Sequence, residues 1–347
     1  MGQLFGNMRG GLAVSTILVG ALLAASTGVV GASVVAMGVI SLPVMLRYGY
    51  QRSLACGAIC AAGTLGQIIP PSIVLIILGD VLGLPVGDLF KAAAIPGMIL
   101  VALYVVYALT VAFARPEAAP PVRFSEHGVA GLRRYLTALR AVVPPLLLIV
   151  VVLGSIFAGV ATPTESSALG GLGAVLLALL YRKFSWRMLY DSALETVRIT
   201  AMVFAILLGA TAFSMAFTYT GGDIIVEQFL VQLPGEKWGF LIFSMTIILL
   251  LGFFIDFVEI SFIVVPILAP IAELLGISLL WFAILVAMNL QTSFLTPPFG
   301  FSLFYLKGVA PPSVRTADIY RGVLPFILMQ VSVMVSILVF PDLYGLL

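Results

Sequence analysis

Long stretches without a charged residue are the feature that most limits how this chain can fold. They span 10–46, 53–79, 92–114, 141–164, 166–181, 199–222, 238–255, 260–272, 274–306 and 322–341. A helix that crosses a bilayer needs about 20 apolar residues, so several of these runs fit one crossing each. With 62% hydrophobic and 9% charged residues, the chain cannot cover a surface that faces water. We therefore predict an all-α polytopic membrane protein.

The same composition excludes soluble enzymes, secreted disulfide scaffolds, nucleic-acid binders and disordered regulators. A single histidine, His127, argues against a histidine-ligated metal site. Cys56 and Cys60 stand four residues apart in an apolar run, and we expect small buried hydrophobes there, not a disulfide. The chain has no nucleophile-elbow, zinc-protease or Walker A motif, so we expect neither an enzyme nor a cofactor.

Three of the charge-free runs are too long for one ordinary crossing and contain helix breakers. Run 10–46 has a polar, glycine-containing middle, and runs 53–79 and 274–306 each contain two consecutive prolines. Prolines interrupt a helix, and the freed backbone groups cannot face lipid. We predict a broken helix over the first run and re-entrant helical hairpins over 53–85 and 278–307. The residues predicted near the hairpin tips are Pro70, Pro71, Ser72, Pro297 and Pro298.

An internal repeat relates the two halves of the sequence. A shift of 227 residues places Pro43 on Pro270, Gly49 on Gly276, and one proline pair on the other. Each half then reads as broken helix, hairpin and helix, and five intervening crossings put the hairpins on opposite sides of the membrane. Inverted repeats of this kind are characteristic of secondary transporters, whose sites lie at the breaks. The predicted segments are a first repeat over 1–114 that ends in helix 92–114, and a second repeat over 141–347 with helices 141–161, 163–181 and 190–220, broken helix 238–272, hairpin 278–307 and helix 322–341.

Capping residues and charged residues predict where one helix begins, where the linker lies and which side of the membrane the linker faces. Thr162 followed by Pro163 and Glu165 predicts a capping box that opens helix 163–181. Residues 115–140 carry five arginines and predict an amphipathic linker along the cytoplasmic surface. The predicted topology puts twelve Lys and Arg residues on the linker's side and four on the other, namely Arg47, Arg52, Lys91 and Lys237. The linker's side is therefore predicted to be cytoplasmic.

Polar residues inside the apolar runs are the candidate site. Asp256 and Glu259 interrupt an apolar stretch, where a carboxylate costs about 2.5–3.5 kcal/mol and needs a partner. Asp256 is interpreted as a ligand of a coupling cation, with a helix-packing polar pair as the alternative. Hydroxyl, glycine and amide residues cluster at both breaks, and such oxygens suit sodium better than calcium. Helix N-termini at the tips could hold a substrate carboxylate. The clustered residues are Ser26, Thr27, Gly28, Gly63, Thr64, Gly66, Asn289, Gln291, Thr292, Ser293 and Thr296.

Four long segments resemble one transporter family over almost the whole chain. They are GTLGQIIPPSIVLIILGD (63–80), VATPTESSALGG (160–171), GFFIDFVEISFIVVP (252–266) and TSFLTPPFG (292–300). They are similar to the large membrane subunit of tripartite ATP-independent periplasmic (TRAP) transporters. In that family the stretch matching GNMRGGLAVST usually follows further hydrophobic segments, so the resemblance implies that the first repeat is incomplete at its N-terminus.

The resemblance also implies a function and a set of partners. It implies an inner-membrane symporter that takes up a small organic acid with sodium by an elevator mechanism. A periplasmic substrate-binding protein would deliver the acid, and a small membrane subunit would complete the complex. No transition metal is expected. Carried onto this chain, the sodium-binding residues are Thr27, Gly28, Gly63, Thr64, Gly66, Asp256, Thr292 and Thr296, and the substrate or tip residues add Ser26, Glu259, Gln291 and Ser293.

Two other functions remain open from the sequence alone. A channel could also use paired hairpins, and passive conductance without sodium dependence would distinguish it. A scaffold subunit without transport activity of its own is the second alternative, suggested by the short N-terminus. The substrate itself is not predicted, because specificity would largely reside in the binding protein.

Overall fold

The chain folds into helices and turns throughout the residues that the computed structural model describes, 8–122 and 131–347. Six helical segments are long and apolar enough to cross a membrane: Val30–Arg47, Val86–Ala114, Pro163–Leu180, Trp186–Tyr219, Phe257–Leu274 and Thr316–Val339. The chain is an all-α polytopic membrane protein.

The helices of the first half are α2 (Gly11–Thr27), α3 (Val30–Arg47), α4 (Arg52–Thr64), η1 (Leu65–Gln67), α5 (Ile73–Leu82) and α6 (Val86–Ala114). The later ones are α7 (Gly131–Phe157), α8 (Pro163–Leu180), α9 (Trp186–Tyr219), α10 (Gly222–Val231), α11 (Lys237–Leu251), α12 (Phe257–Glu259), the π-helix η2 (Ile260–Val264), α13 (Val265–Leu274), α14 (Leu279–Leu295), α15 (Phe301–Val309), α16 (Thr316–Val339) and η3 (Pro341–Tyr344).

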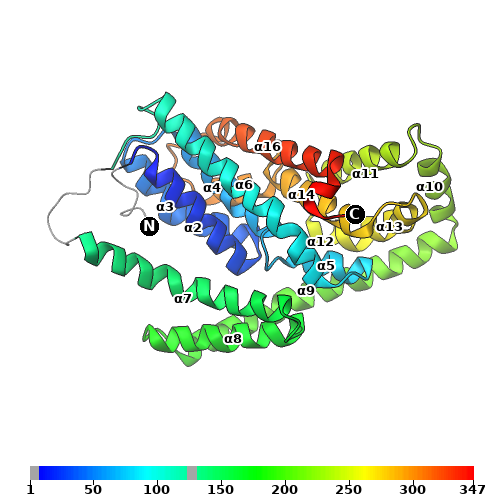
Figure 1. Cartoon of the computed structure of the whole chain (residues 1–347), viewed down its shortest axis with the longest axis horizontal. Coiled ribbons are helices and arrows are strands. Elements are labelled where there is room, and N and C mark those ends of the chain that lie inside the picture. Colours follow the sequence, from blue (N-terminus) through cyan, green and yellow to red (C-terminus); the bar gives the residue numbers. More distant parts are fainter. Residues whose placement is uncertain (1–7, 123–130) are drawn as a thin grey trace.

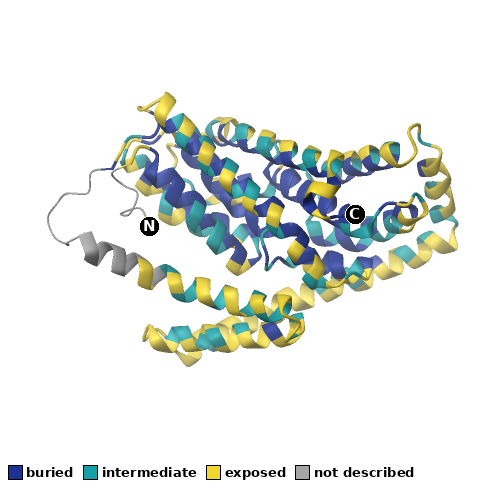
Figure 2. Ribbon diagram, in the orientation of Figure 1, coloured by how far each residue is buried: buried dark blue, intermediate teal, exposed yellow. Residues whose placement is uncertain are grey.

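Two parts with different burial are visible in Figure 1 and Figure 2. Helices α2–α6 and α11–α16 form a bundle with a continuous apolar core. Helices α7–α9 form an arm along one side of it, and most of their residues are exposed. In α8 only Ser166 is buried, and in α9 only Ala210 is buried. Apolar side chains that stay exposed in a membrane protein can face lipid or another membrane chain.

The first two helices fold back on each other. The Gly10 N–H donates to the Ala119 carbonyl (3.0 Å), and the Gln51 N–H donates to the Ala118 carbonyl (2.9 Å). The Tyr50 hydroxyl also accepts from the Leu12 N–H (3.2 Å). The start of α2 and the end of α3 therefore lie together, at what we call end A of the molecule. Gly28, in the left-handed conformation at the end of α2, lets the chain turn between the two helices.

The next segment, α4–η1–α5, runs through the bundle instead of turning back. Gln51 and Leu54 at the start of α4 line one cavity with Tyr107 and Ala114 near the end of α6. Because α6 is a single helix of 29 residues, its start and the end of α5 lie far from end A. The segment is a helix that is broken in its middle.

The second half has the same pattern in the opposite direction. The ring centroids of Trp238 (α11) and Trp281 (α14) are 6.3 Å apart, and the Trp281 indole N–H donates to the Ile337 carbonyl of α16 (3.0 Å). The starts of α11 and α14 and the ends of α13 and α16 therefore lie together, at end B. The start of α16 is at end A, because Gly322 lies against the Ser53 backbone. Helices α11 and α12–α13 thus fold back, and α14–α15 runs through.

The structure reverses the predicted assignment of hairpins and broken helices. Residues 53–85 and 278–307, predicted to be hairpins, are broken helices that run through, and 10–46 and 238–272, predicted to be broken helices, are hairpins. Both kinds of segment have a break in the middle of an apolar run, and run length alone does not reveal which way the chain leaves it. The proline pairs remain at breaks, and both peptide bonds, Pro70-Pro71 and Pro297-Pro298, are cis.

The predictions for the capping box, the two cysteines and the linker can be compared directly with the structure. The capping box is confirmed: the Glu165 carboxylate accepts from the Thr162 N–H (2.8 Å), and the Thr162 hydroxyl accepts from the Glu165 N–H (3.3 Å). Cys56 and Cys60 are free and buried, as predicted. Residues 123–130 of the linker, with His127, lie outside the described residues, and the linker's last ten residues belong to α7.

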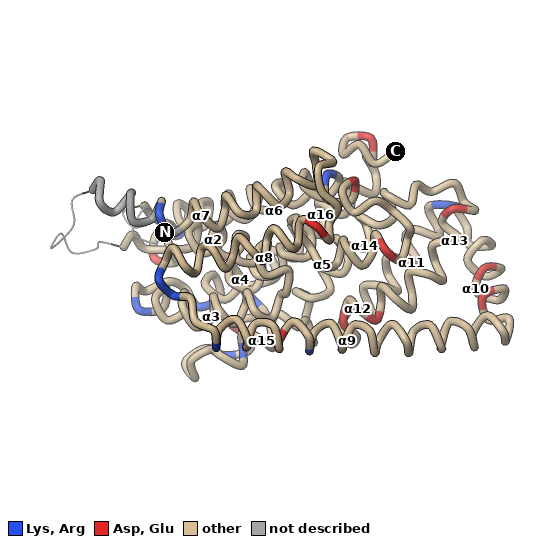
Figure 3. The backbone as a smooth tube through the Cα atoms, turned by 90° about the horizontal axis from the view of Figure 1, so that it is seen from below, with Lys and Arg blue, Asp and Glu red and all other residues tan. Residues whose placement is uncertain are grey.

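The charge distribution differs from the predicted one at one place. Arg47 and Arg52 flank the turn at end A, beside Ala118, so they belong with the majority of the cations. Lys and Arg gather toward this end in Figure 3. The revised positions strengthen the charge asymmetry from which the orientation is predicted.

Candidate transport site

The break of the first half is built from the hairpin tip and the middle of the broken helix. The Thr27 hydroxyl is hydrogen-bonded to the Ser33 hydroxyl (2.8 Å), and Ser26 donates to the Leu23 carbonyl (2.8 Å). Gly66 allows a close approach to this tip, because a Cβ atom at Gly66 would be 2.5 Å from the Ala24 carbonyl oxygen. Ser26, Thr27, Gly28 and Gly66 are therefore brought together.

Thr64 and Ser72 face other neighbours. Thr64 is fully buried, its hydroxyl donates to the Ala61 carbonyl (2.9 Å), and it accepts from the Gln330 amide (3.3 Å). The Thr64 side chain therefore does not join the group at the tip. Ser72 donates to the Gln67 carbonyl (2.7 Å) and caps α5. Gly63 packs against Val34 of the hairpin.

The break of the second half carries the carboxylates. The Asp256 carboxylate accepts from the Phe257 N–H (2.7 Å) and caps α12. One carboxylate oxygen of Glu259, three residues later, is buried and has no hydrogen-bond partner in the described part of the chain. The ring centroids of Phe257 and Phe294 are 6.1 Å apart, and Gly252 lies against Ser293. This hairpin tip thus contacts the middle of its own broken helix, as in the first half.

The hydroxyls at the end of α14 are oriented by the helix itself. Thr292 donates to the Met288 carbonyl (2.8 Å), Ser293 to Leu290 (2.8 Å) and Thr296 to Thr292 (2.7 Å). Each hydroxyl proton is used in one of these hydrogen bonds, so lone pairs of the hydroxyl oxygens stay available to a cation. Gln291 is fully buried, and within residues 8–122 and 131–347 neither of its amide atoms makes a hydrogen bond of ordinary geometry. The Tyr320 hydroxyl donates to the Pro298 carbonyl (2.8 Å) and holds the second proline pair.

Several polar residues near the breaks were not predicted as site residues. Tyr305 of α15 packs its ring against Gly31 of the first hairpin. Gln330, Tyr104 and Gln67 are fully buried polar residues in the bundle core. The signal for Gln330 was available, since it is a lone amide inside the charge-free run 322–341. No group of three potential metal-ligating His, Cys, Asp or Glu residues occurs within 8–122 and 131–347.

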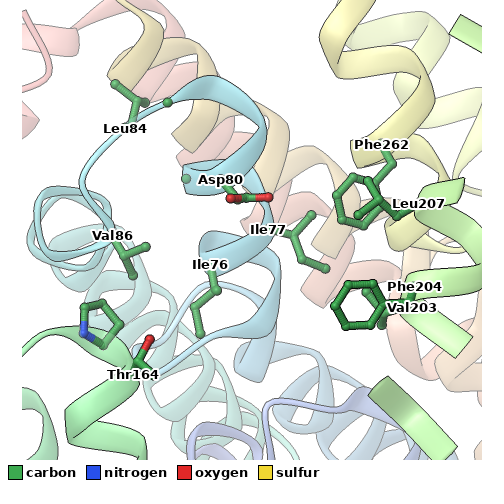
Figure 4. A pocket seen from close by; sticks show the side chains of 13 residues that line it. Ile76, Ile77, Asp80, Leu84, Val86, Thr164, Val203, Phe204, Leu207 and Phe262 are labelled. Atoms are coloured by element: carbon green, nitrogen blue, oxygen red, sulfur yellow. The ribbon is translucent and has the colours of Figure 1, made fainter. Parts of the chain in front are cut away.

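A cavity of about 610 Å³ is shown in Figure 4. It is bounded by α5, the start of α8, α9 and η2, and its walls are mainly apolar. Asp80 and Thr164 supply its polar side chains. None of the predicted site residues lines it, so the geometry at the breaks and not this cavity defines the candidate site.

Comparison with known proteins identifies the family. The family described as "Tripartite ATP-independent periplasmic transporter, DctM component" matches residues 1–343. The C4-dicarboxylate TRAP transporter large permease protein DctM of Pseudomonas aeruginosa is 32% identical over 97% of this chain and 77% of that protein. The ectoine/5-hydroxyectoine TRAP transporter large permease protein UehC of Ruegeria pomeroyi is 30% identical, with the same two shares covered.

A third relative has a longer chain. The sialic acid TRAP transporter permease protein SiaT of Haemophilus influenzae is 28% identical over 98% of this chain and 54% of its own length. All three are bacterial transport permeases and not enzymes, and six apolar helices agree with a multi-pass protein of the bacterial inner membrane. The chain belongs to the DctM family, the large permease subunits of TRAP transporters.

Proposed function

We propose that this permease takes up a small organic acid with sodium, as a secondary active symporter. A periplasmic binding protein would deliver the acid, and a small membrane subunit would complete the complex. The observation that carries the proposal is the pairing at the breaks. In each half, a hairpin tip contacts the unwound middle of a broken helix, and polar side-chain oxygens lie on the segments that meet.

An inverted repeat with re-entrant hairpins is part of the proposal. Moving the bounds of α3 by 227 residues gives 257–274, the bounds of the second hairpin's returning segment. The same shift carries α4 to 279–291, within α14, and α5 to 300–309, against Phe301–Val309 for α15. One hairpin opens at end A and the other at end B, which supports opposite insertion. If the hairpins and broken helices moved together across the membrane while the arm of helices α7–α9 stayed fixed, the movement would be an elevator movement.

Two sodium positions are proposed, one at each break. The first lies around Thr27-Gly28 and the backbone of Gly63–Gly66. The second lies around Asp256, Thr292 and Thr296, where one carboxylate and neutral oxygens would surround a monovalent ion. The N-termini of α5 and α15 would hold the substrate carboxylate, beside Ser72 and the second proline pair.

The energy of a sodium gradient supports coupled uptake, and the names of the relatives support a small polar solute. Each sodium ion that moves inward across 100 mV supplies about 2.3 kcal/mol. The relatives are named for C4-dicarboxylate, isethionate, ectoine and sialic acid, all of which are small polar solutes. We propose end A as the cytoplasmic end, from its excess of Lys and Arg.

The test is uptake by the permease reconstituted with its membrane partner and its binding protein. The labelled solutes are a C4-dicarboxylate, isethionate, ectoine and sialic acid, each with and without an inward sodium gradient. Asp256→Asn should reduce sodium-driven uptake about tenfold or more, whereas Asp342→Asn, at an exposed C-terminal position, should not. Unchanged sodium dependence in Asp256→Asn would contradict the assignment of Asp256.

The alternatives predict other results. Flux without sodium dependence, down the solute's own gradient, would indicate a channel. No uptake of any of these solutes, together with no binding of sodium, would favour a scaffold subunit.

A further inference from the structure

Four fully buried polar side chains from four helices meet in the core of the bundle. They are Thr64 of α4, Tyr104 of α6, Gln291 of α14 and Gln330 of α16, and each is 0% exposed. The Gln330 amide N–H groups donate to the Tyr104 hydroxyl (2.8 Å) and to the Thr64 hydroxyl (3.3 Å). The Gln291 side chain lies beside the same Tyr104 hydroxyl. We call these four residues the core tie.

The core tie joins the two halves of the chain. Thr64 and Gln291 are 227 residues apart, and Tyr104 and Gln330 are 226 apart, so each pair occupies matching helices of the two halves. The hydrogen bonds run between the halves, because Gln330 belongs to the second half and contacts two hydroxyls of the first. Each of the two long helices thus reaches the broken helix of the other half.

Burial restricts the positions that the Gln330 side chain can take. An amide without partners in an apolar interior is unfavourable, so the Gln330 N–H groups favour the position in which both of their hydrogen bonds form, whereas the Gln330 amide oxygen has no partner among the described residues. The Thr64 hydroxyl donates to Ala61 and accepts from Gln330, which orients the last turn of α4. Gly66, two residues later, packs closely against the hairpin, since a Cβ atom at Gly66 would be 2.5 Å from the Ala24 carbonyl oxygen. A displacement of Thr64 would therefore reach the first break through the backbone.

We propose that Gln330 and Tyr104 are positioning residues for the first cation site. Neither residue touches the cation. They hold Thr64, and Thr64 holds the backbone of Gly63–Gly66 against the hairpin tip. This inference rests on the proposed function, because it requires that a cation binds at that tip.

Sodium binding can be measured without knowledge of the substrate. The permease, purified with its membrane partner, is heated at increasing sodium chloride, with choline chloride keeping the ionic strength constant. A ligand that binds the folded state raises the melting temperature with its concentration, which yields an apparent Kd for sodium. Gln330→Leu and Thr64→Val should each raise this Kd about three- to tenfold, the worth of one buried hydrogen bond.

Milder and matched variants separate positioning from general stability. Thr64→Ser keeps the hydroxyl and should leave the Kd near that of the parent, whereas Tyr104→Phe should raise it. Ser332→Ala on α16 removes an exposed hydroxyl that is bonded to its own helix, and serves as the control. If Gln330→Leu does not fold, the comparison of Thr64→Ser with Thr64→Val decides.

The outcomes distinguish this inference from the proposed function. A parent protein whose melting temperature does not respond to sodium would refute the proposed function. A parent that responds, with an unchanged Kd in Thr64→Val and Tyr104→Phe, would overturn the core tie as a positioning device and leave the proposed function standing. Lower melting temperatures at zero sodium with the parent's Kd would assign the four residues to packing alone.

Discussion

Replacing Gly66 by alanine tests whether the two segments at the first break must touch for sodium to bind. A Cβ atom at this position would be 2.5 Å from the Ala24 carbonyl oxygen and 2.9 Å from its carbon, and ordinary contacts begin at 3.4 Å. The backbone of the broken helix must therefore withdraw from the hairpin tip by about 0.9 Å to reach an ordinary contact. The obstacle is backbone and not a flexible side chain, so no rotamer change can relieve it.

A displacement of this size is large for a cation site. Ligand distances at a metal site hold to about 0.2 Å, so oxygens contributed from both segments could no longer converge on one ion. Overpacking also costs about 1–3 kcal/mol, which corresponds to roughly five- to 140-fold in an equilibrium constant. We expect Gly66→Ala to raise the apparent Kd for sodium at least about tenfold.

The assay is the same sodium-dependent melting curve, with Gly308→Ala as the matched control. Gly308 lies in α15, and a Cβ atom there would meet nothing within 4 Å. The control should keep the parent's Kd. If Gly66→Ala folds and binds sodium as tightly as the parent, the first break does not contribute ligands from both segments.

Two further predictions concern packing and access. Gly57→Ala places a Cβ atom against the Gly322 carbonyl, where α4 and α16 touch through their backbones, and should lower the melting temperature in detergent, whereas Gly308→Ala should not. Single cysteines at Phe299 and Ser72, in a cysteine-free background, should react unequally with a small hydrophilic thiol reagent, because Phe299 is 44% exposed and Ser72 is fully buried. Equal rates at the two positions would contradict the described break, and an unaltered melting temperature in Gly57→Ala would contradict the described helix contact.

Hydropathy and capping signals predicted most of the helices because they depend on local chemistry. The predicted helix 163–181 matches Pro163–Leu180 almost residue for residue, since a capping box fixes where a helix begins. The amphipathic linker was predicted to end at residue 140, whereas its last ten residues belong to the same helix as the apolar run that follows, because α7 starts at Gly131. A helix continues beyond the bilayer wherever its residues permit, and charge-free length does not record that.

The exchange between hairpins and broken helices has a different cause. Sequence marks a break by proline, glycine or a polar residue, but the direction of the chain after the break depends on packing between distant segments. At Gly28 the left-handed residue ends α2 and the chain returns to end A. At Pro70-Pro71 the chain leaves in the direction it entered, because α5 packs on the second half. The 227-residue repeat was visible in the sequence because it requires only that matching positions share residue types.

Thr64 shows how a helical period could have sharpened the predicted site. Thr64 and Gly66 are two residues apart, about 200° around a helix, so the two cannot face the same neighbour. A residue that approaches another backbone closely must lack a Cβ atom, which selects Gly66 for the hairpin tip. The Thr64 hydroxyl must then find a partner in the core, and a lone glutamine in an apolar run of the other half is the kind of residue that can supply one. The structure pairs the Thr64 hydroxyl with the Gln330 amide, and we propose on this basis that Thr64 holds the ligands of the first cation site in place.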